Sequence, residues 1–151
     1  KIVPEEMAVL RSTLVSLLKR PAMAGGSIFV VSPFRSIADM AARVIDDVRR
    51  TQIAPAAMRA DTVHAFQGQE ADAVIFVLGT EKGARGRRQR HWAANPTNLL
   101  NVGVTRARRA IVVIGCVEDW RAEPAFAILA ERLRIRGAVL GESDRILAAT
   151  R

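Results

Sequence analysis

Three short apolar runs constrain the fold of this chain more than any other feature. They cover residues 27–31, 73–78 and 109–115, and the first two read Ser-Ile-Phe-Val-Val and Ala-Val-Ile-Phe-Val-Leu. The first run shows no alternation of apolar and polar residues, which is typical of a strand buried on both faces of a parallel sheet. The other two also predict buried strands. The chain therefore favours a sheet enclosed by helices on both sides.

The segments around these runs have helical patterns. Residues 5–20 place Glu5 and Glu6 at the start and Lys19 and Arg20 at the end, as the helix dipole favours. We predict further helices over residues 35–50, 96–108, 123–136 and 142–149, a short strand near 58–63 and a solvated loop over 81–92. Strands that alternate with helices predict an α/β domain with a mainly parallel sheet.

Length and the ends of the chain bear on domain organisation. The 151 residues suffice for one domain with one core. The first residues, Lys1 to Glu6, contain neither an initiator methionine nor the apolar core of a signal peptide, so we expect a piece of a larger protein. No apolar run approaches the ~20 residues of a membrane span, and we expect no membrane partner.

Charge and cysteine content narrow the class of partner. The formal net charge is +8 and the pI is about 11.3, a basic excess that attracts polyanions such as nucleic acid. A solvated arginine-rich surface is the alternative interpretation. Cys116 is the only cysteine, which excludes a disulfide within the chain and fits a reducing cytoplasm. His64 and His91 have no spacing that matches a metal-ligand set, so we expect no metal ligands here.

A first polar segment covers residues 62–70 and links one predicted strand to the next. Gly68 lets the backbone approach a ligand closely and adopt conformations closed to other residues. Thr62 and His64 have short polar side chains suited to a phosphate, and Gln67 and Glu70 have acceptors for ribose hydroxyls. The alternative is a tight turn whose polar residues only satisfy backbone groups.

A second polar segment covers residues 98–109 and ends in three closely spaced arginines. Arg106, Arg108 and Arg109 lie where a predicted helix meets a strand. Planar guanidinium groups match phosphate oxygens and can stabilise charge on a transferred phosphoryl group. Cations at a helix C-terminus are also common for structural reasons alone. The residues leave both interpretations open.

The two segments, together with residues 30–35, resemble three ordered motifs of the second RecA-like domain of superfamily 1 helicases. Residues 30–35 resemble motif IV, residues 62–70 motif V, and residues 101–108 motif VI. The resemblance is greatest to the branch that includes the nonsense-mediated decay helicases, and it covers about residues 1–120. It implies a RecA-like, P-loop-NTPase-type three-layer sandwich that forms one domain over residues 1–151.

The resemblance implies a nucleotide-facing group of residues. Arg106 matches the arginine finger that reaches across a cleft to the γ-phosphate of ATP, and we take it as the catalytic residue. Gly68 matches the motif V glycine near that phosphate. Glu70 matches the acid that contacts the ribose, and Gln67 lies between the nucleotide and the nucleic acid.

The resemblance also implies a group that contacts the backbone of single-stranded DNA or RNA. Its members are Ser32, Pro33, Arg35, Thr62 and His64. Two positions depart from the family pattern. Ile37 stands where motif IV usually ends in Gln, and Gly103 with Val104 replaces the usual Ala-Leu of motif VI.

The chain contains no Gly-x-x-x-x-Gly-Lys-Ser/Thr sequence, the phosphate loop that binds ATP in this class. We therefore expect ATP and Mg²⁺ to act in the parent protein, with Mg²⁺ held mainly by an N-terminal RecA-like domain that is the partner of this one. The isolated domain is expected to be inactive. The competing hypothesis is a non-catalytic RecA-like module that holds nucleic acid or another protein.

Overall fold

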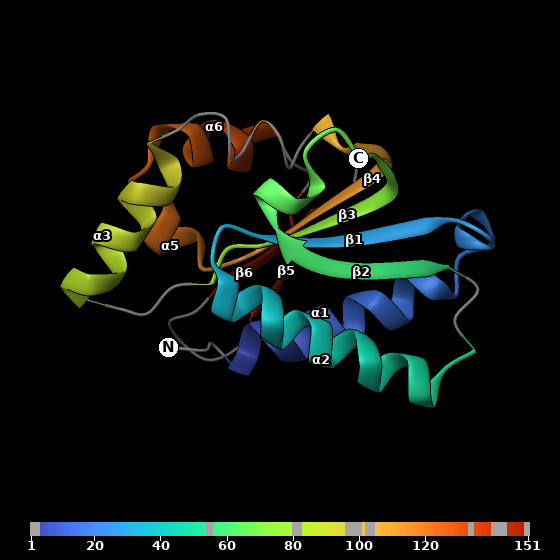
Figure 1. Ribbon diagram of the computed structural model, residues 1–151. Helices are drawn as coiled ribbons and strands as arrows, with labels where there is room; N and C mark the ends of the chain where they lie inside the picture. The colour runs from blue at the N-terminus through green and yellow to red at the C-terminus, as the bar shows by residue number, and fades with distance from the viewer. Residues whose placement is uncertain are drawn as a thin grey trace.

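The computed structural model describes residues 4–53, 56–79, 83–95, 101, 105–132, 135–139 and 145–149. Its centre is a four-stranded, all-parallel sheet with the strand order β2-β1-β3-β4 (Figure 1). The strands are β1 (Ser27–Ser32), β2 (Ala57–Thr62), β3 (Ala71–Val77) and β4 (Ala107–Ile114). The predicted fold class, an α/β fold with a mainly parallel sheet, is confirmed, and the sheet is compatible with a RecA-like domain.

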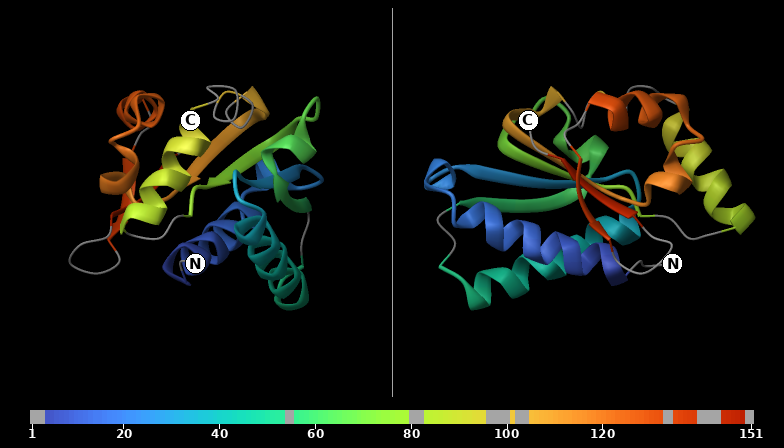
Figure 2. Two further views of the ribbon diagram at one scale, coloured as in Figure 1. Left: turned by 60° about the vertical axis from the view of Figure 1, so that its left-hand side comes forward. Right: turned by 180° about the vertical axis from the view of Figure 1, so that it is seen from behind.

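Helices lie on both faces of this sheet, which gives three layers (Figure 2). One face packs against α1 (Pro4–Leu18) and α2 (Arg35–Thr51). The other packs against the short helix η2 (Val63–Phe66) and against α3 (Gly83–Ala94), α5 (Val117–Trp120) and α6 (Pro124–Arg132). A short turn of helix, η1 (Pro21–Met23), precedes β1. Among the described residues, no helix has the length and apolar character needed to cross a membrane.

The core divides into two clusters because successive side chains of a strand point to opposite faces. In β1, Ile28 and Val30 belong to the cluster under α1 and α2, while Phe29 and Val31 belong to the cluster on the other face. All four side chains are buried. An apolar run without alternation therefore fills both layers at once, which is what the sequence predicted for this strand.

The strand order creates a switch point between β1 and β3. The chain leaves β1 through α2 toward β2 on one side, and it leaves β3 toward β4 on the other. The connections diverge between these two adjacent strands. In open α/β sheets, ligands bind outside the carboxyl ends of the strands at such a point. Helix α3 lies at this end of the sheet (Figure 1).

The prediction of a solvated loop over residues 81–92 is wrong for the described part, because residues 83–94 form α3. The sequence of this helix is rich in arginine and glycine, so its buried face cannot be recognised from apolar residues. That face consists of Gly86, Arg90 and Ala93, spaced as i, i+4 and i+7. Two small residues and one arginine do not register as an apolar stripe, so the periodicity gave no helical signal.

The C-terminal predictions are also partly wrong. Instead of a helix over 142–149, the chain forms an antiparallel pair of β5 (Ile135–Val139) and β6 (Arg145–Ala149). Helix α6 ends at Arg132, four residues before the predicted boundary at 136. Strand pairing depends on a partner elsewhere in the chain, which local spacing does not reveal. Of the helix predicted over 96–108, residues 96–100 and 102–104 lie outside the described residues; Thr105 is helical and β4 starts at Ala107.

Candidate functional site

The predicted site residues lie at opposite edges of the sheet. Ser32 and Thr62 are the last residues of β1 and β2 and pair in register at the carboxyl edge. Glu70 and Arg106 directly precede β3 and β4 at the amino edge, where the Ala71 N–H donates to the Arg106 carbonyl at 2.9 Å. A strand of six residues spans about 20 Å, so the two groups are separated by roughly that distance.

The segment between Thr62 and Ala71 carries the chain from one edge to the other across a face of the sheet. Phe66 fixes this crossing, because its ring is fully buried and stacks on Phe29 of β1 with centroids 4.3 Å apart. The Arg59 guanidinium lies 5.4 Å from the centre of the Phe66 ring. Motif V therefore contributes residues to both edges, and one buried aromatic side chain holds its middle.

Two of the three arginines at the amino edge form ion pairs with acidic residues at the start of β3, one just before the strand and one in it. Arg108 Nε lies 3.0 Å from Glu70 Oε2. Arg109 Nε lies 3.5 Å from Asp72 Oδ1, and Arg109 Nη1 donates to the Ala22 carbonyl at 3.0 Å. Both arginines thus have structural partners.

Arg106 differs from its two neighbours. Its Nε is buried and has no hydrogen-bond partner within the part of the chain that the structure describes. The residue as a whole is half-buried. A buried guanidinium N–H without a partner is costly unless a ligand or another chain supplies an acceptor. Arg106, which the motif VI resemblance names as the arginine finger, thus differs from Arg108 and Arg109 in having a buried N–H without a partner among the described residues.

Gly68 adopts a backbone conformation that favours glycine, with φ of +80°. No heavy atom lies within 4 Å of the position that a Cβ would take, so the conformation, and not crowding, calls for glycine here. Gln67 and Glu70 on either side are exposed. This arrangement leaves open space beside the backbone at the amino edge.

Gln69 was not singled out from the sequence, yet its side chain holds the turn. Its Nε2 donates to the Ala65 carbonyl at 3.2 Å, and its Oε1 accepts from Arg59 Nη1 at 3.1 Å. A glutamine in a polar loop has no sequence signal that separates such an internal role from a ligand contact.

At the carboxyl edge, the motif IV residues mainly shape the turn after β1. Ser32 is fully buried, and its Oγ accepts the Phe34 N–H at 3.2 Å. Pro33 is also buried. Contact with a ligand through these two residues would therefore involve their backbone or require the turn to open.

The exposed polar side chains at this edge come from neighbouring positions. Arg35 Nη1 lies 2.7 Å from Asp61 Oδ1, and the same oxygen accepts the Thr62 N–H at 2.7 Å. The Arg35–Asp61 pair links the start of α2 to the end of β2. His64 is exposed and Thr62 half-buried. The carboxyl edge thus carries an arginine–aspartate ion pair, a hydroxyl and an imidazole.

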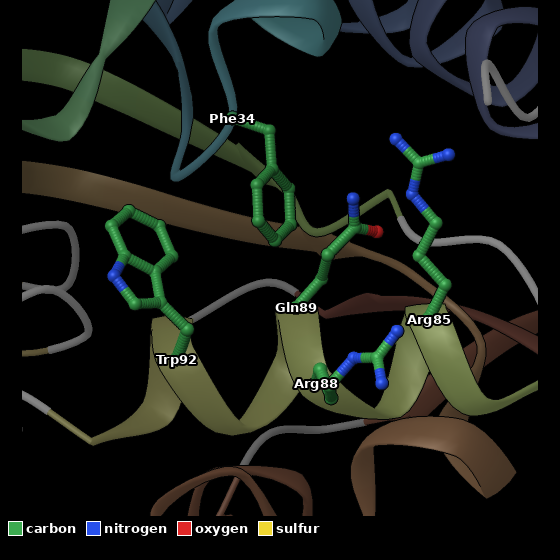
Figure 3. Close-up of a pocket in the computed structure, with 5 residues that line it drawn as sticks. All are labelled: Phe34, Arg85, Arg88, Gln89 and Trp92. Carbon is green, nitrogen blue, oxygen red and sulfur yellow. The ribbon is translucent and has the colours of Figure 1, made fainter.

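A pocket of about 440 Å³ adjoins this edge, between the loop after β1 and helix α3 (Figure 3). It is lined by Phe34, Arg85, Arg88, Gln89 and Trp92. No sequence pattern connects Phe34 with the residues of α3, because the sequence predicts a loop over residues 81–92. The pocket combines two aromatic rings with two arginines and an amide.

Glu6 is a buried acid near the same edge. Its Oε2 accepts the Gly79 N–H at 2.9 Å, just beyond the end of β3. Burial raises the pKa of Glu6 to about 8, an effect that the hydrogen bond from Gly79 partly offsets. Nearby acids, Glu5 and Asp119, raise this pKa further. The group is therefore largely protonated at neutral pH.

No group of three or more His, Cys, Asp or Glu side chains in the described ranges is placed to hold a metal ion. The sole thiol, Cys116, is half-buried, and burial raises its pKa.

Comparisons with known proteins give a consistent family signal. The AAA domain family matches residues 1–118. The chain is 25% identical over 134 residues to the DNA replication ATP-dependent helicase/nuclease DNA2 of Homo sapiens, covering 87% of this chain and 12% of that protein. It is 34% identical over 73 residues to the probable helicase MAGATAMA 3 of Arabidopsis thaliana, covering 47% of this chain and 8% of that protein.

Among solved structures, the chain resembles the phosphoethanolamine N-methyltransferase 2 of Haemonchus contortus, with a TM-score of 0.54 and 10% identity. This likeness covers 100% of the chain and 38% of that structure. At this identity it reflects a shared α/β architecture and nothing about activity.

Proposed function

Because the chain belongs to the AAA domain family and is homologous to helicases, we propose that it is the second motor domain of an ATP-dependent superfamily 1 helicase or translocase. In this role it supplies an arginine finger to a site shared with a first RecA-like domain and holds part of a single strand. The chain spans about a tenth of the length of the curated relatives it matches, so the remaining parts belong to the parent protein.

The observation that carries this proposal is the unpaired Nε of Arg106. Arg108 and Arg109 are neutralised by Glu70 and Asp72, whereas Arg106 has no acceptor for this N–H among the described residues. A guanidinium placed half-buried at a sheet edge is suited to an anion that arrives from outside the domain. The γ-phosphate of ATP bound to a facing domain is such an anion.

The surrounding residues fit a nucleotide at the same edge. The space beside Gly68 admits close approach of a phosphate to the backbone, and the exposed Glu70 carboxylate can accept a hydrogen bond from a ribose hydroxyl. Glu70 would then exchange or share its pairing with Arg108. Mg²⁺ would be held by the first domain and would supply charge neutralisation at the β- and γ-phosphates.

The two edges then act together in one cycle. When ATP draws the two motor domains together, Arg106 reaches the developing charge on the transferred phosphoryl group, while the carboxyl edge holds the strand. The crossing segment that contains Phe66 joins the two edges mechanically. Backbone contacts carry no sequence information, so the grip is expected to tolerate any sequence.

The test is ATP turnover of the parent protein with Arg106→Ala. An arginine finger contributes about 10³- to 10⁵-fold to kcat, so turnover should fall by at least a factor of a hundred while ATP binding is retained. Arg108→Ala is the matched control, because it removes a neighbouring guanidinium with a structural partner, and its effect should stay within a few fold. Equal turnover in Arg106→Ala and the parent would remove the finger assignment.

The isolated chain tests whether the ATP site is shared with another domain. Lacking a phosphate loop, it should hydrolyse no ATP at any concentration tested. Robust hydrolysis by the purified 151-residue chain would contradict the shared site. A parent protein in which no phosphate loop precedes this domain would favour the binding module instead.

A further inference from the structure

The pocket between Phe34 and helix α3 contains aromatic rings, which are not needed to hold a nucleic-acid strand by its sugar-phosphate backbone. We propose that it is a stacking site for an unpaired nucleobase of the single strand, an inference that rests on the proposed function and names a second mode of contact. In this mode a base stacks on the exposed ring of Trp92 beside Phe34, and the arginines of α3 contact the adjoining phosphates (Figure 3).

The two rings of the pocket are not packed against each other as core rings are. The centroids of Phe34 and Trp92 lie 6.2 Å apart with the planes inclined by 34°. In the core, Trp120 and Phe126 have centroids only 4.3 Å apart. Trp92 is 56% exposed, although tryptophan is usually among the most buried side chains. Its ring therefore has surface available to another aromatic plane.

Helix α3 places the polar lining beside this ring. Arg85, Arg88, Gln89 and Trp92 are spaced as i, i+3, i+4 and i+7, which puts them on one face of the helix. Residues 83–94 contain no acidic side chain. Arginine contacts phosphate through its charge and stacks on bases through its plane, and the glutamine amide can donate to and accept from base edges.

The opposite face of α3 anchors the helix to the core. Arg90 is almost fully buried, and its Nη2 lies 3.5 Å from Asp119 Oδ1 of α5. His91 Nδ1 lies 3.6 Å from Glu123 Oε2, and Ala93 is buried. A helix held in this way presents Trp92 from a fixed support, which reduces the entropy lost when a base stacks on it.

The pocket continues the carboxyl edge of the sheet. The Phe34 N–H bonds to the Oγ of Ser32, the last residue of β1, and Arg35 follows Phe34 directly. The pocket therefore adjoins the switch point between β1 and β3. A strand held by its backbone at Thr62 and His64 can direct a base toward this pocket.

The chemistry favours a nucleobase over other occupants. The pocket is widely open to solvent, whereas small-molecule sites bury most of their ligand. Its lining contains cations and aromatic rings without a carboxylate, and the chain carries a net charge of +8. Aromatic side chains beside a basic groove are the usual means of holding single-stranded nucleic acid.

The test uses tryptophan fluorescence of the 151-residue chain at low salt. The chain has two tryptophans, Trp92 and Trp120, and Trp120→Phe leaves Trp92 as the only reporter. Trp120 Nε1 has no hydrogen-bond partner among the described residues, so this background change removes no such bond. Oligo(dT) is compared with an abasic oligonucleotide of the same length, which retains the phosphates and lacks the bases.

Stacking predicts that oligo(dT) quenches Trp92 and that the abasic strand does not. Trp92→Ala, in the otherwise unchanged chain and followed with a labelled strand, should weaken oligo(dT) binding about 5- to 100-fold while abasic binding is unchanged. Trp92→Phe should restore most of the affinity. Ile128→Ala is the matched control, because Ile128 is also 56% exposed but lies on α6, and it should change neither.

Two results would overturn the inference, and they differ in what they say of the proposed function. Equal binding of the two strands without quenching would exclude stacking and leave the backbone grip intact. Failure of both strands to bind would remove the nucleic-acid role altogether, and the stacking site with it.

Discussion

The two edges of this sheet carry charges of different kinds. At the amino edge, two arginines are paired with acids, as Arg108–Glu70 and Arg109–Asp72. The third, Arg106, has a buried Nε without a hydrogen-bond partner among the described residues. At the carboxyl edge, Arg35 is paired with Asp61, the buried acid Glu6 accepts the Gly79 N–H, and a pocket combines two further arginines with two aromatic rings.

This difference shows how one small domain can serve two ligands. A parallel sheet exposes its strand ends at two edges about 20 Å apart, and motif V crosses between them. The amino edge, where Arg108 and Arg109 but not Arg106 have an acidic partner among the described residues, is suited to binding a single phosphoryl group. The carboxyl edge, with its arginines and aromatic rings, is suited to a nucleic-acid strand. If the two edges are independent, a change at one edge should leave the ligand of the other unaffected.

The largest expected effect concerns Glu6 and therefore the carboxyl edge alone. The pKa of Glu6 is raised from 4.5 to about 8 in the folded chain, so the folded state binds one more proton than the unfolded state between these values. The free energy of unfolding should then fall as pH rises from 5 to 8, by up to about 4 kcal/mol from this group. Below pH 4.5, Glu6 makes its full contribution to the free energy of unfolding.

Urea denaturation at several pH values measures this slope. Glu6→Gln should remove most of it and be more stable than the parent chain at pH 8, because a neutral amide oxygen can still accept from the Gly79 N–H. An unchanged slope in Glu6→Gln would place the titration elsewhere. Glu5→Gln, on the exposed neighbour, is the matched control and should leave the slope nearly intact.

Salt dependence should distinguish the edges next. If Arg85 and Arg88 each neutralise a phosphate, and Arg35 exchanges its pairing with Asp61 for a third phosphate, the logarithm of the single-strand affinity should fall with the logarithm of salt with a slope of about −2. That corresponds to roughly a hundredfold loss between 50 mM and 500 mM salt. Arg88→Gln should make the slope shallower, and Arg108→Gln at the amino edge should not. Equal changes in both variants would mean that the strand contacts both edges.

The smallest effect concerns Gly68. Alanine in a conformation with φ of +80° costs about 1–2 kcal/mol, although no neighbouring atom obstructs its Cβ. Gly25 has a φ of +71° and equally open surroundings, so Gly25→Ala should cost a similar amount in a thermal melt. Only Gly68→Ala should also lower ATP turnover of the parent protein. Loss of turnover in both variants would reduce the role of Gly68 to stability.

The sequence predicted the central layers well and the peripheral elements poorly. Strands β1 and β3 are largely apolar on both faces, a pattern typical of buried parallel strands. Helix α2 has a clear apolar side. Helix α3 was not predicted because its buried face contains Arg90, whose ion-pair partner Asp119 lies 29 positions away in the sequence. The β5–β6 pair depends on cross-strand contacts that no local pattern contains.

The site divides in the same way. The resemblance to motif VI named Arg106, but composition and spacing alone do not distinguish it from Arg108 and Arg109, and the sequence does not show which of the three has an acidic partner. That distinction arises from the register of β3 against β4, which brings Glu70 and Asp72 to the other two arginines. The pocket at Phe34 was inaccessible to sequence reasoning for a similar reason, because its walls come from elements that only the fold brings together.

The most direct measurement of the separation between the edges is a paired assay on one parent protein. ATP turnover and single-strand affinity are measured for Arg106→Ala and for the double variant Thr62→Val with His64→Ala. Arg106→Ala should lose at least a hundredfold in turnover and keep its strand affinity without nucleotide. The double variant should lose strand affinity and keep its basal, strand-independent turnover. If each variant lost both activities to the same extent, the assignment of one ligand to each edge would be wrong.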